Sequence, residues 1–434
     1  MAASLGGGDG IEAAELAIRA GLTRLGRSVL EDLLAADGGY RGPRADCGAG
    51  HQARFVSCRD KAVDTVLGPV TLSRAWYHCA ACGHGFAPRD AELGVAGQTM
   101  SPGLAKMADR AGAAVPFTPA AKLVGELAGI EMGGKRLGRR AEADGAAAAA
   151  VIEAEAAAIT ARTVIPLPPA GPLPDILYIA VDGTGVPVIS AETEGRAGKG
   201  EDGKARTREV KLCCCFTQTS PGEDGRPVRD PHSSSYLATF APAAGFGTLM
   251  AGEARRRGAG HVRQMVILGD GAHWIWNLAT AHFPQATAIV DLYHARQHLH
   301  DLGKQLAFML GDHHAGWVAE RLDDLDNGDI DAIISAARVF PLAGVKAEEL
   351  DTALGYFGTN AHRMRYKHFR SLGMFVGSGA VEAGCRAVIG QRLKLSGMHW
   401  SVPGATGILT LRCQEASGRW EEIWPQPHHQ TGAA

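Results

Sequence analysis

The sequence lacks any apolar run that approaches the ~20 residues needed to span a bilayer. Its N-terminus also lacks the basic segment followed by an apolar segment that marks a secretory signal peptide. An excess of charge is missing as well, because 44 Lys and Arg stand against 46 Asp and Glu, a formal net charge of −2. We therefore expect a soluble cytoplasmic protein with no membrane partner, in which any attraction to a polyanion comes from local basic patches.

The cysteines do not follow the pattern of a disulfide framework. There are nine in a chain of 434 residues, an odd number, and Cys213, Cys214 and Cys215 are consecutive. This usage favours reduced thiols, some of which are available to bind metal. Hydrophobic residues make up 46% and charged residues 21%, which is typical of globular proteins, and the length predicts about two to four domains.

The chain divides by pattern into six segments. A helical periodicity over residues 11–36 precedes a hairpin pattern with Gly68 and Pro69 at its tip. Short helical patterns follow, and an Ala-rich helix over residues 144–162 leads into a cluster of prolines that marks the main domain boundary. We predict an N-terminal helix (1–40), a zinc-ribbon-like module (41–95), a small helical domain (96–163), a Pro-rich linker (164–175), a catalytic domain (176–420) and a flexible tail (421–434). The small helical domain is either a helix-turn-helix that binds DNA or a plain helical linker domain.

A candidate zinc site brackets the hairpin. Cys79 and Cys82 form a C-x-x-C pair at its end, and Cys47 and His51 precede it. Two such pairs fit a zinc ribbon, in which Zn²⁺ takes four sulfur or nitrogen ligands tetrahedrally and substitutes for a missing core. Because the first pair departs from C-x-x-C, His51 has three alternatives as a ligand, namely Cys58, His78 and His84. A set of plain reduced cysteines is the alternative to structural zinc.

Three acidic residues in the second half of the chain adjoin glycines at the ends of elements. Asp182 and Asp270 each follow an apolar strand, and Glu382 opens a helix after a Gly-rich segment. The order of three strands, alternating helices and strands, and then helices is that of a ribonuclease-H-like α/β core, although other three-layer α/β folds share it. Three carboxylates at one sheet edge suit Mg²⁺ or Mn²⁺, whereas one alone is typical of an ordinary turn.

Basic residues concentrate between residues 361 and 400, where seven Lys and Arg stand against one acid, Glu382. Phosphate contacts by such a strip give affinity for double-stranded DNA without sequence choice. Tyr366, Phe369 and Trp400 interleave with it, and they either stack on unpaired bases or pack in the core. The residues that we expect to contact DNA are Arg363, Arg365, Lys367, Arg370, Arg392 and Lys394, together with Arg136, Arg139 and Arg140 of the small helical domain.

Several segments carry a family resemblance: residues 268–277 (LGDGAHWIWN), 377–385 (GSGAVEAGC), 392–401 (RLKLSGMHWS), 65–70 (TVLGPV) and 76–83 (WYHCAACG). They resemble bacterial insertion-sequence transposases of the ISKra type, which belong to the DDE group. The resemblance implies a ribonuclease-H-like catalytic domain with an all-helical insertion at about residues 296–370. It also implies that Asp182, Asp270 and Glu382 form a metal-binding catalytic triad for DNA transposition, a cleavage of element ends followed by strand transfer into target DNA.

Residues 291–294 (DLYH) resemble the Asp/Cys-x-x-His signature of related transposases. The resemblance implies that His294 contacts the scissile phosphate or a DNA strand, and the alternative is a solvated residue in the first turn of a helix. For Asp291 we favour a helix cap. By the same analogy we expect a homo-oligomer on DNA, associated with the nucleoid. The alternative functions are a metal-dependent nuclease of the same fold without strand transfer and a non-catalytic DNA-binding protein derived from a transposase.

Overall fold

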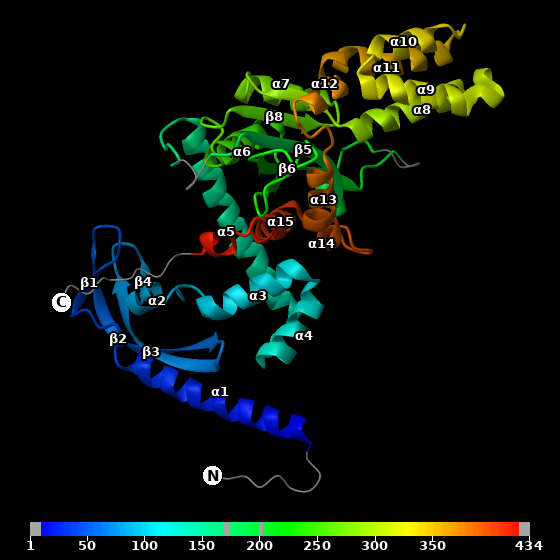
Figure 1. The fold of residues 1–434 in the computed structure, drawn as a ribbon. Helices are drawn as coiled ribbons and strands as arrows, with labels where there is room; N and C mark the ends of the chain where they lie inside the picture. The colour runs from blue at the N-terminus through cyan, green and yellow to red at the C-terminus, as the bar shows by residue number, and fades with distance from the viewer. Residues whose placement is uncertain (1–9, 168–172, 199–202, 425–434) are drawn as a thin grey trace. The chain divides into compact units, whose positions relative to one another are not determined.

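The computed structural model describes residues 10–167, 173–198 and 203–424 (Figure 1). Its backbone forms two compact units, residues 1–141 and 142–434. The division falls inside one continuous helix, α5 (Gly134–Thr160), so that the Pro-rich segment 164–175 belongs to the second unit. Residues 168–172 of that segment lie outside the described residues, as do residues 425–434 of the predicted flexible tail.

The first unit is built on the predicted hairpin. Helix α1 (Ile11–Ala35) precedes a four-stranded antiparallel sheet in the order β1-β2-β3-β4. The bounds of its strands are β1 Arg44–Asp46, β2 Gln52–Thr65, β3 Gly68–Cys79 and β4 His84–Phe86. Thr65 pairs with Gly68 across the tip, where Gly68 has a φ of +95° that side-chain-bearing residues rarely adopt. The predicted N-terminal helix and hairpin are both confirmed.

Three small clusters of apolar side chains stabilise this unit, one of which lies beneath the Cys/His residues of the hairpin. Val63, Val70 and Leu72 of the hairpin are buried together, and Leu30 and Leu34 of α1 pack against them. The short helix α2 (Pro88–Glu92) follows the hairpin. Beyond it, a second cluster joins α3 (Pro102–Ala114), α4 (Phe117–Ala128) and the start of α5. The burial is spread over short elements, so each cluster is small for a unit of this length.

Helix α5 runs without a break where the sequence predicts two helices. The Ala-rich helix predicted over residues 144–162 continues the helix that carries Arg136 and Arg139. Gly145 does not end the helix because it lies where α5 crosses α15 (Val402–Ala416). A Cβ atom at Gly145 would lie 2.1 Å from the carbonyl oxygen of Gly407, so this glycine permits close packing of two helices.

The second unit contains a five-stranded mixed sheet in the order β7-β6-β5-β8-β9. Strand β6 pairs antiparallel with both β5 and β7, whereas β5 pairs parallel with β8, and β8 parallel with β9. Their bounds are β5 Ile176–Pro187, β6 Thr207–Gln218, β7 Ser235–Thr239, β8 Gln264–Gly269 and β9 Thr287–Val290. Cys213, Cys214 and Cys215 are fully buried in β6, as expected for cysteines that act as small apolar residues. The mixed α/β prediction is thus confirmed.

The helices of the second unit lie between the strands and after them along the chain. Those between the strands are α6 (Ala243–Arg256) and α7 (His273–His282). Helices α8 (Leu292–Leu310), α9 (His314–Asn327), α10 (Ile330–Arg338) and α11 (Val345–Asn360) then extend beyond the sheet as a helical arm (Figure 1). The chain returns through α12 (Tyr366–Ser371), α13 (Gly379–Gly384), a π-helical turn (Cys385–Gly390) and α14 (Gln391–Leu393) to α15.

Candidate functional site

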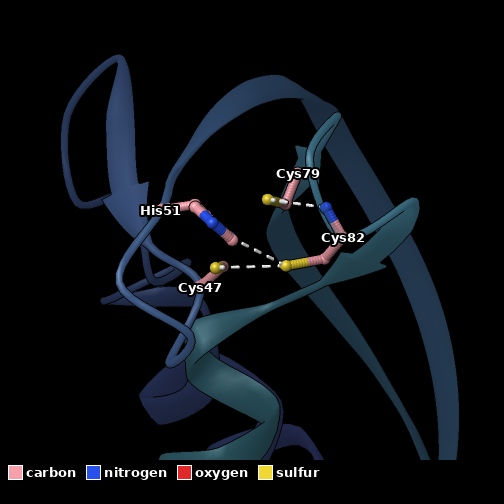
Figure 2. Close-up of side chains that lie close together, drawn as sticks. All are labelled: Cys47, His51, Cys79 and Cys82. Atoms are coloured by element: carbon pink, nitrogen blue, oxygen red, sulfur yellow. Dashed lines mark hydrogen bonds between the residues drawn. The ribbon is translucent and has the colours of Figure 1, made fainter.

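Cys47, His51, Cys79 and Cys82 come together in the first unit (Figure 2). One potential ligand atom from each lies within 4.8 Å of those of the other three. The Sγ atoms of Cys47 and Cys82 are 3.7 Å apart, and His51 Nδ1 lies 3.2 Å from Cys82 Sγ. The four residues come from the turn between β1 and β2 and the turn between β3 and β4.

This geometry fits a tetrahedral zinc ion. With Zn–S bonds of ~2.3 Å, two sulfur ligands of a tetrahedron lie ~3.8 Å apart, close to the separation of Cys47 and Cys82. Three thiols and an imidazole are also the soft ligand set that zinc prefers over Mg²⁺ or Ca²⁺. The group can therefore hold a metal ion such as zinc.

The local backbone explains why these residues converge. Between Cys47 and His51, Gly48 and Gly50 both have a φ near +80°, which lets the turn fold back so that Cys47 N–H donates to the carbonyl oxygen of His51. In the second turn, the N–H of Cys82 donates to Cys79 Sγ at 3.4 Å. Such backbone donors stabilise a thiolate, and the hydrogen bond from Ala49 is the largest cause that lowers the pKa of Cys47 to about 7. The neighbouring Cys79 and Cys47 raise the pKa of Cys82 to about 12.

His51 is a member of this group, although its spacing departs from the usual C-x-x-C pair. The three alternatives predicted from sequence, Cys58, His78 and His84, do not belong to it within the described residues. The small core beneath the site contains Tyr77 and Cys79, with Cys47 and Phe86 packed against it. A metal ion would replace the apolar contacts that so small a core cannot supply.

In the second unit, Asp182 lies inside β5 and Asp270 is the first residue after the neighbouring parallel strand β8. The pairing of these two strands ends at Ala180 and Leu268, two residues before each aspartate. Val290 of β9 pairs with Gly269, so Asp291 continues the same row. Residues in register on adjacent strands lie ~4.8 Å apart and project from the same face. Continued in this register, Asp182, Asp270 and Asp291 fall in one row, which passes through the middle of β5 and just beyond the ends of β8 and β9.

The segment that carries Glu382 is attached to both ends of this row. At one end, Ser378 N–H donates to Asp291 Oδ2, and Ser378 Oγ lies 3.3 Å from Glu382 Oε1. At the other end, Cys385 Sγ donates to Asp182 Oδ2 at 3.2 Å. Glu382 lies between these two attachments, on the exposed side of α13. Burial, followed by the charge of Asp182, raises the pKa of the Cys385 thiol well above its usual value, so the thiol stays a donor.

Asp291 caps helix α8, as favoured from the sequence. Its Oδ1 accepts from the N–H of His294 at 2.7 Å, and its Oδ2 accepts from Ser378. The side chain is buried, and both oxygens accept backbone N–H groups, so Asp291 holds the start of α8 and the Glu382 segment together. This second contact is invisible in the sequence because the two residues are far apart along the chain.

The three carboxylates predicted as a triad do not form a single tight cluster. Within the part of the chain that the structure describes, the Cys/His group is the sole set of three or more potential ligands converging within 4.8 Å. Asp182 and Asp270 are half-buried and Glu382 is exposed. Asp182 Oδ1 accepts from the N–H of Gly183 and Asp270 Oδ1 accepts from that of Ala272. The second oxygen of Asp182 accepts from Cys385, as described above, and carboxylate oxygens of this kind suit a hard divalent cation.

Two residues of the helical arm contact the Asp270 loop and carried no signal in the sequence analysis. Tyr356 Oη donates to the carbonyl oxygen of Asp270 at 3.0 Å, and the His298 ring stacks on Tyr356 with centroids 3.8 Å apart. Burial and then the charge of Asp270 raise the pKa of Tyr356, while burial and His294 lower the pKa of His298. His294 is half-buried in the first turn of α8, within electrostatic reach of His298.

The predicted basic strip divides into exposed and buried residues. Arg365, Lys367, Arg370 and Lys394 are exposed, while Arg363 is half-buried with its guanidinium 4.7 Å from the centre of the Trp276 ring. Arg370 lies 3.9 Å from Asp326, and Lys394 donates to Thr184 Oγ1. These exposed residues remain available to contact phosphates.

The side chain of Arg392 is fully buried, which contradicts the DNA contact predicted for it. Its guanidinium lies 5.0 Å from the centre of the Trp400 ring and donates to Met398 Sδ at 3.5 Å. Desolvation lowers its pKa to about 10. A buried guanidinium cannot reach a phosphate in this structure, so the predicted DNA contact is wrong and the residue is structural. Tyr366, Phe369 and Trp400 are buried too, which settles the two alternatives for them in favour of core packing.

The basic residues of the first unit have different surroundings. Arg136 forms an ion pair of 2.6 Å with Asp64 and donates to Thr99, so it joins α5 to the hairpin. Arg139 is exposed, and Arg140 is half-buried. Arg139 is therefore the residue of the three with a side chain most open to a partner.

Comparison of the sequence with known proteins does not assign it to a family. No family model matches the sequence, and no curated protein matches it significantly. Among the described residues, no helix is both long and apolar enough to cross a membrane.

Proposed function

We propose that this protein is a DDE-type DNA transposase with a ribonuclease-H-like catalytic core. One observation carries the proposal: Asp182 in β5 and Asp270 just after β8 each lie two residues beyond the last pair of these strands, and the segment of Glu382 is attached to Asp291 and Asp182. The sheet order β7-β6-β5-β8-β9, antiparallel on one side and parallel on the other, supports a ribonuclease-H-like assignment. The resemblance of residues 268–277, 377–385 and 392–401 to ISKra-type transposases supports the reaction.

Mg²⁺ or Mn²⁺ would be held by Asp182, Asp270 and Glu382. Bound there, two divalent ions ~3.5–4 Å apart would stabilise the attacking and leaving oxygens of an in-line phosphoryl displacement. Carboxylates that hold two ions need not converge on one point, which agrees with their spread along the sheet edge and α13. The two aspartates are half-buried, and hydrogen bonds from the N–H groups of Gly183 and Ala272 orient their Oδ1 atoms.

The remaining residues would bind and position double-stranded DNA. Arg365, Lys367 and Lys394 are exposed on the segments that lead into and out of the Glu382 helix, where they would contact phosphates. His294, in the first turn of α8 beyond the aspartate row, is placed to approach a strand held there. In the first unit, zinc at the Cys/His group would fix the hairpin, and Arg139 would add a phosphate contact.

The test is a cleavage and strand-transfer assay on the DNA that flanks this reading frame, with Mg²⁺ or Mn²⁺. We expect nicks at the element ends and joined products from the wild type, and neither from Asp182→Asn, Asp270→Asn or Glu382→Gln. Asp351→Asn, which changes an exposed acid of the helical arm in the same way, should keep activity. Nicking without joining would favour a nuclease of the same fold, and DNA binding without cleavage would favour a non-catalytic DNA-binding protein.

A further inference from the structure

Helix α1 exposes an apolar stripe that none of the described residues of its own unit cover. Six apolar side chains on it are 49% to 78% exposed: Ile11, Ile18, Leu22, Leu25, Val29 and Leu33. At 100° per residue they fall within about 80° of one another around the helix axis. Monomeric proteins expose single apolar residues commonly, but a continuous stripe of several marks an interaction site.

The opposite face of α1 already has its partner. Leu30 and Leu34 pack on the hairpin core with Val63, Val70 and Leu72, and Leu67 contacts Gly26. Figure 1 shows α1 beside the β2–β3 hairpin. Leu30 and Leu34 pack on the hairpin, while the stripe stays exposed. This arrangement explains why a helix of 25 residues contains no buried residue.

The spacing of the stripe identifies the kind of partner. Ile18, Leu22, Leu25 and Val29 follow one another at intervals of four, three and four residues, and Ile11 stands seven residues before Ile18. Apolar residues that alternate in this way form the seam of a two-stranded coiled coil, in which each side chain inserts between four residues of the facing helix. Glu15 lies three residues before Ile18, and Asp32 lies three residues after Val29. An acidic residue therefore ends the run of four apolar residues on each side.

The charges of α1 argue against a lipid surface as the partner. The helix carries Glu12, Glu15, Glu31 and Asp32 against Arg19, Arg24 and Arg27, so its polar faces have no excess of positive charge. Helices that lie on membranes are rich in Lys and Arg on the polar face. A second copy of the same helix, in contrast, supplies an identical seam and closes a symmetric pair.

We infer that α1 is a dimerisation helix, which pairs with α1 of a second copy of this chain along Ile18, Leu22, Leu25 and Val29. A helix of 25 residues is ~37 Å long, and two such helices side by side bury on the order of 1,000 Å² in total. This area is at the lower limit for a specific interface. The inference does not depend on the proposed function, because pairing through α1 needs neither DNA nor the acidic site.

The experiment is sedimentation velocity of the full chain without DNA, between about 1 and 50 μM. The wild type should shift with concentration from the 45.4 kDa chain mass to twice that mass, and Leu22→Glu/Leu25→Glu should remain at 45.4 kDa throughout. Val339→Glu/Leu372→Glu, which places the same substitutions on exposed apolar residues of the second unit, should dimerise like the wild type. A monomeric wild type, or a seam variant that still dimerises, would overturn the inference.

A second measurement covers the case in which the seam variant loses its fold. A synthetic peptide of residues 10–36 added in excess should dissociate the wild-type dimer, because it offers the same seam. The same peptide with Leu22→Glu and Leu25→Glu should leave the dimer intact. A dimer insensitive to both peptides would show that another surface joins the two copies and would contradict the inference.

Discussion

Tyr356 of helix α11 donates a hydrogen bond from its Oη to the backbone carbonyl oxygen of Asp270, at 3.0 Å. The same ring lies against Gly271, whose φ is +101° and where a Cβ atom would stand 2.6 Å from the ring. The helical arm is thus a support for the loop that presents Asp270. The glycine after Asp270 is required both by its backbone conformation and by this close contact.

Tyr356→Phe should lower kcat for DNA cleavage by roughly fivefold with little change in KM, since it removes one hydrogen bond of ~1 kcal/mol that orients the Asp270 loop. Tyr293→Phe removes the same hydroxyl from an exposed tyrosine of α8 and should have no effect. Steady-state kinetics of both variants test the assignment. An unchanged kcat in Tyr356→Phe would show that the arm does not position Asp270.

The Cys/His group should bind one zinc ion per chain, measurable by atomic absorption of the purified protein. Cys79→Ser or Cys82→Ser should remove the metal and lower the unfolding temperature of the first unit, because the small core beneath the site needs the bound ion. Cys58→Ser changes an exposed thiol outside the group and should retain full occupancy. Protein isolated without metal, and unable to take up zinc or cobalt, would contradict the assignment.

Arg392→Ala should destabilise the second unit by ~2–4 kcal/mol, because it removes a large buried side chain that packs on Trp400. Lys367→Ala, on the exposed side of α12, should leave stability within ~0.5 kcal/mol and instead weaken DNA binding, with a salt slope reduced by about one. Denaturant unfolding and salt-dependent binding separate the two effects. Equal stability of the two variants would disprove the structural role of Arg392.

Gly145→Ala should lower the midpoint of thermal unfolding, since the new methyl group would press on the Gly407 carbonyl oxygen where α5 crosses α15. Gly355→Ala makes the same change in α11, where a Cβ meets nothing within 4 Å, and should stabilise the helix by ~0.5–1 kcal/mol. Opposite shifts of the two midpoints are the expected result. A stabilised Gly145→Ala would mean that the two helices are not in close contact.

The sequence predicts most elements because local patterns are strong where burial is periodic. The hairpin around Gly68 and the helix capped by Asp291 appear as expected. The strand that begins at Ile176 was predicted too short: β5 continues to Pro187 because its second half pairs with β6, so Asp182 lies within the strand and not after it. The separate helices predicted on either side of residues 141–143 form one helix, α5, in the structure. The metal group was predicted by residue type, while the choice of His51 over Cys58, His78 and His84 needed the fold of the β1–β2 turn.

Local sequence by itself determined the α/β alternation, the position of Asp270 after its strand and the ligand types of the Cys/His group, since each depends on neighbours along the chain. The tertiary structure decided which acids share a row, because register is set by pairing between β5, β8 and β9. It also decided that Arg392 is buried while Arg365 and Lys367 are exposed, although all three belong to one basic strip in the sequence. Burial of a charge depends on contacts between distant segments, here around Trp400, and no local pattern encodes them.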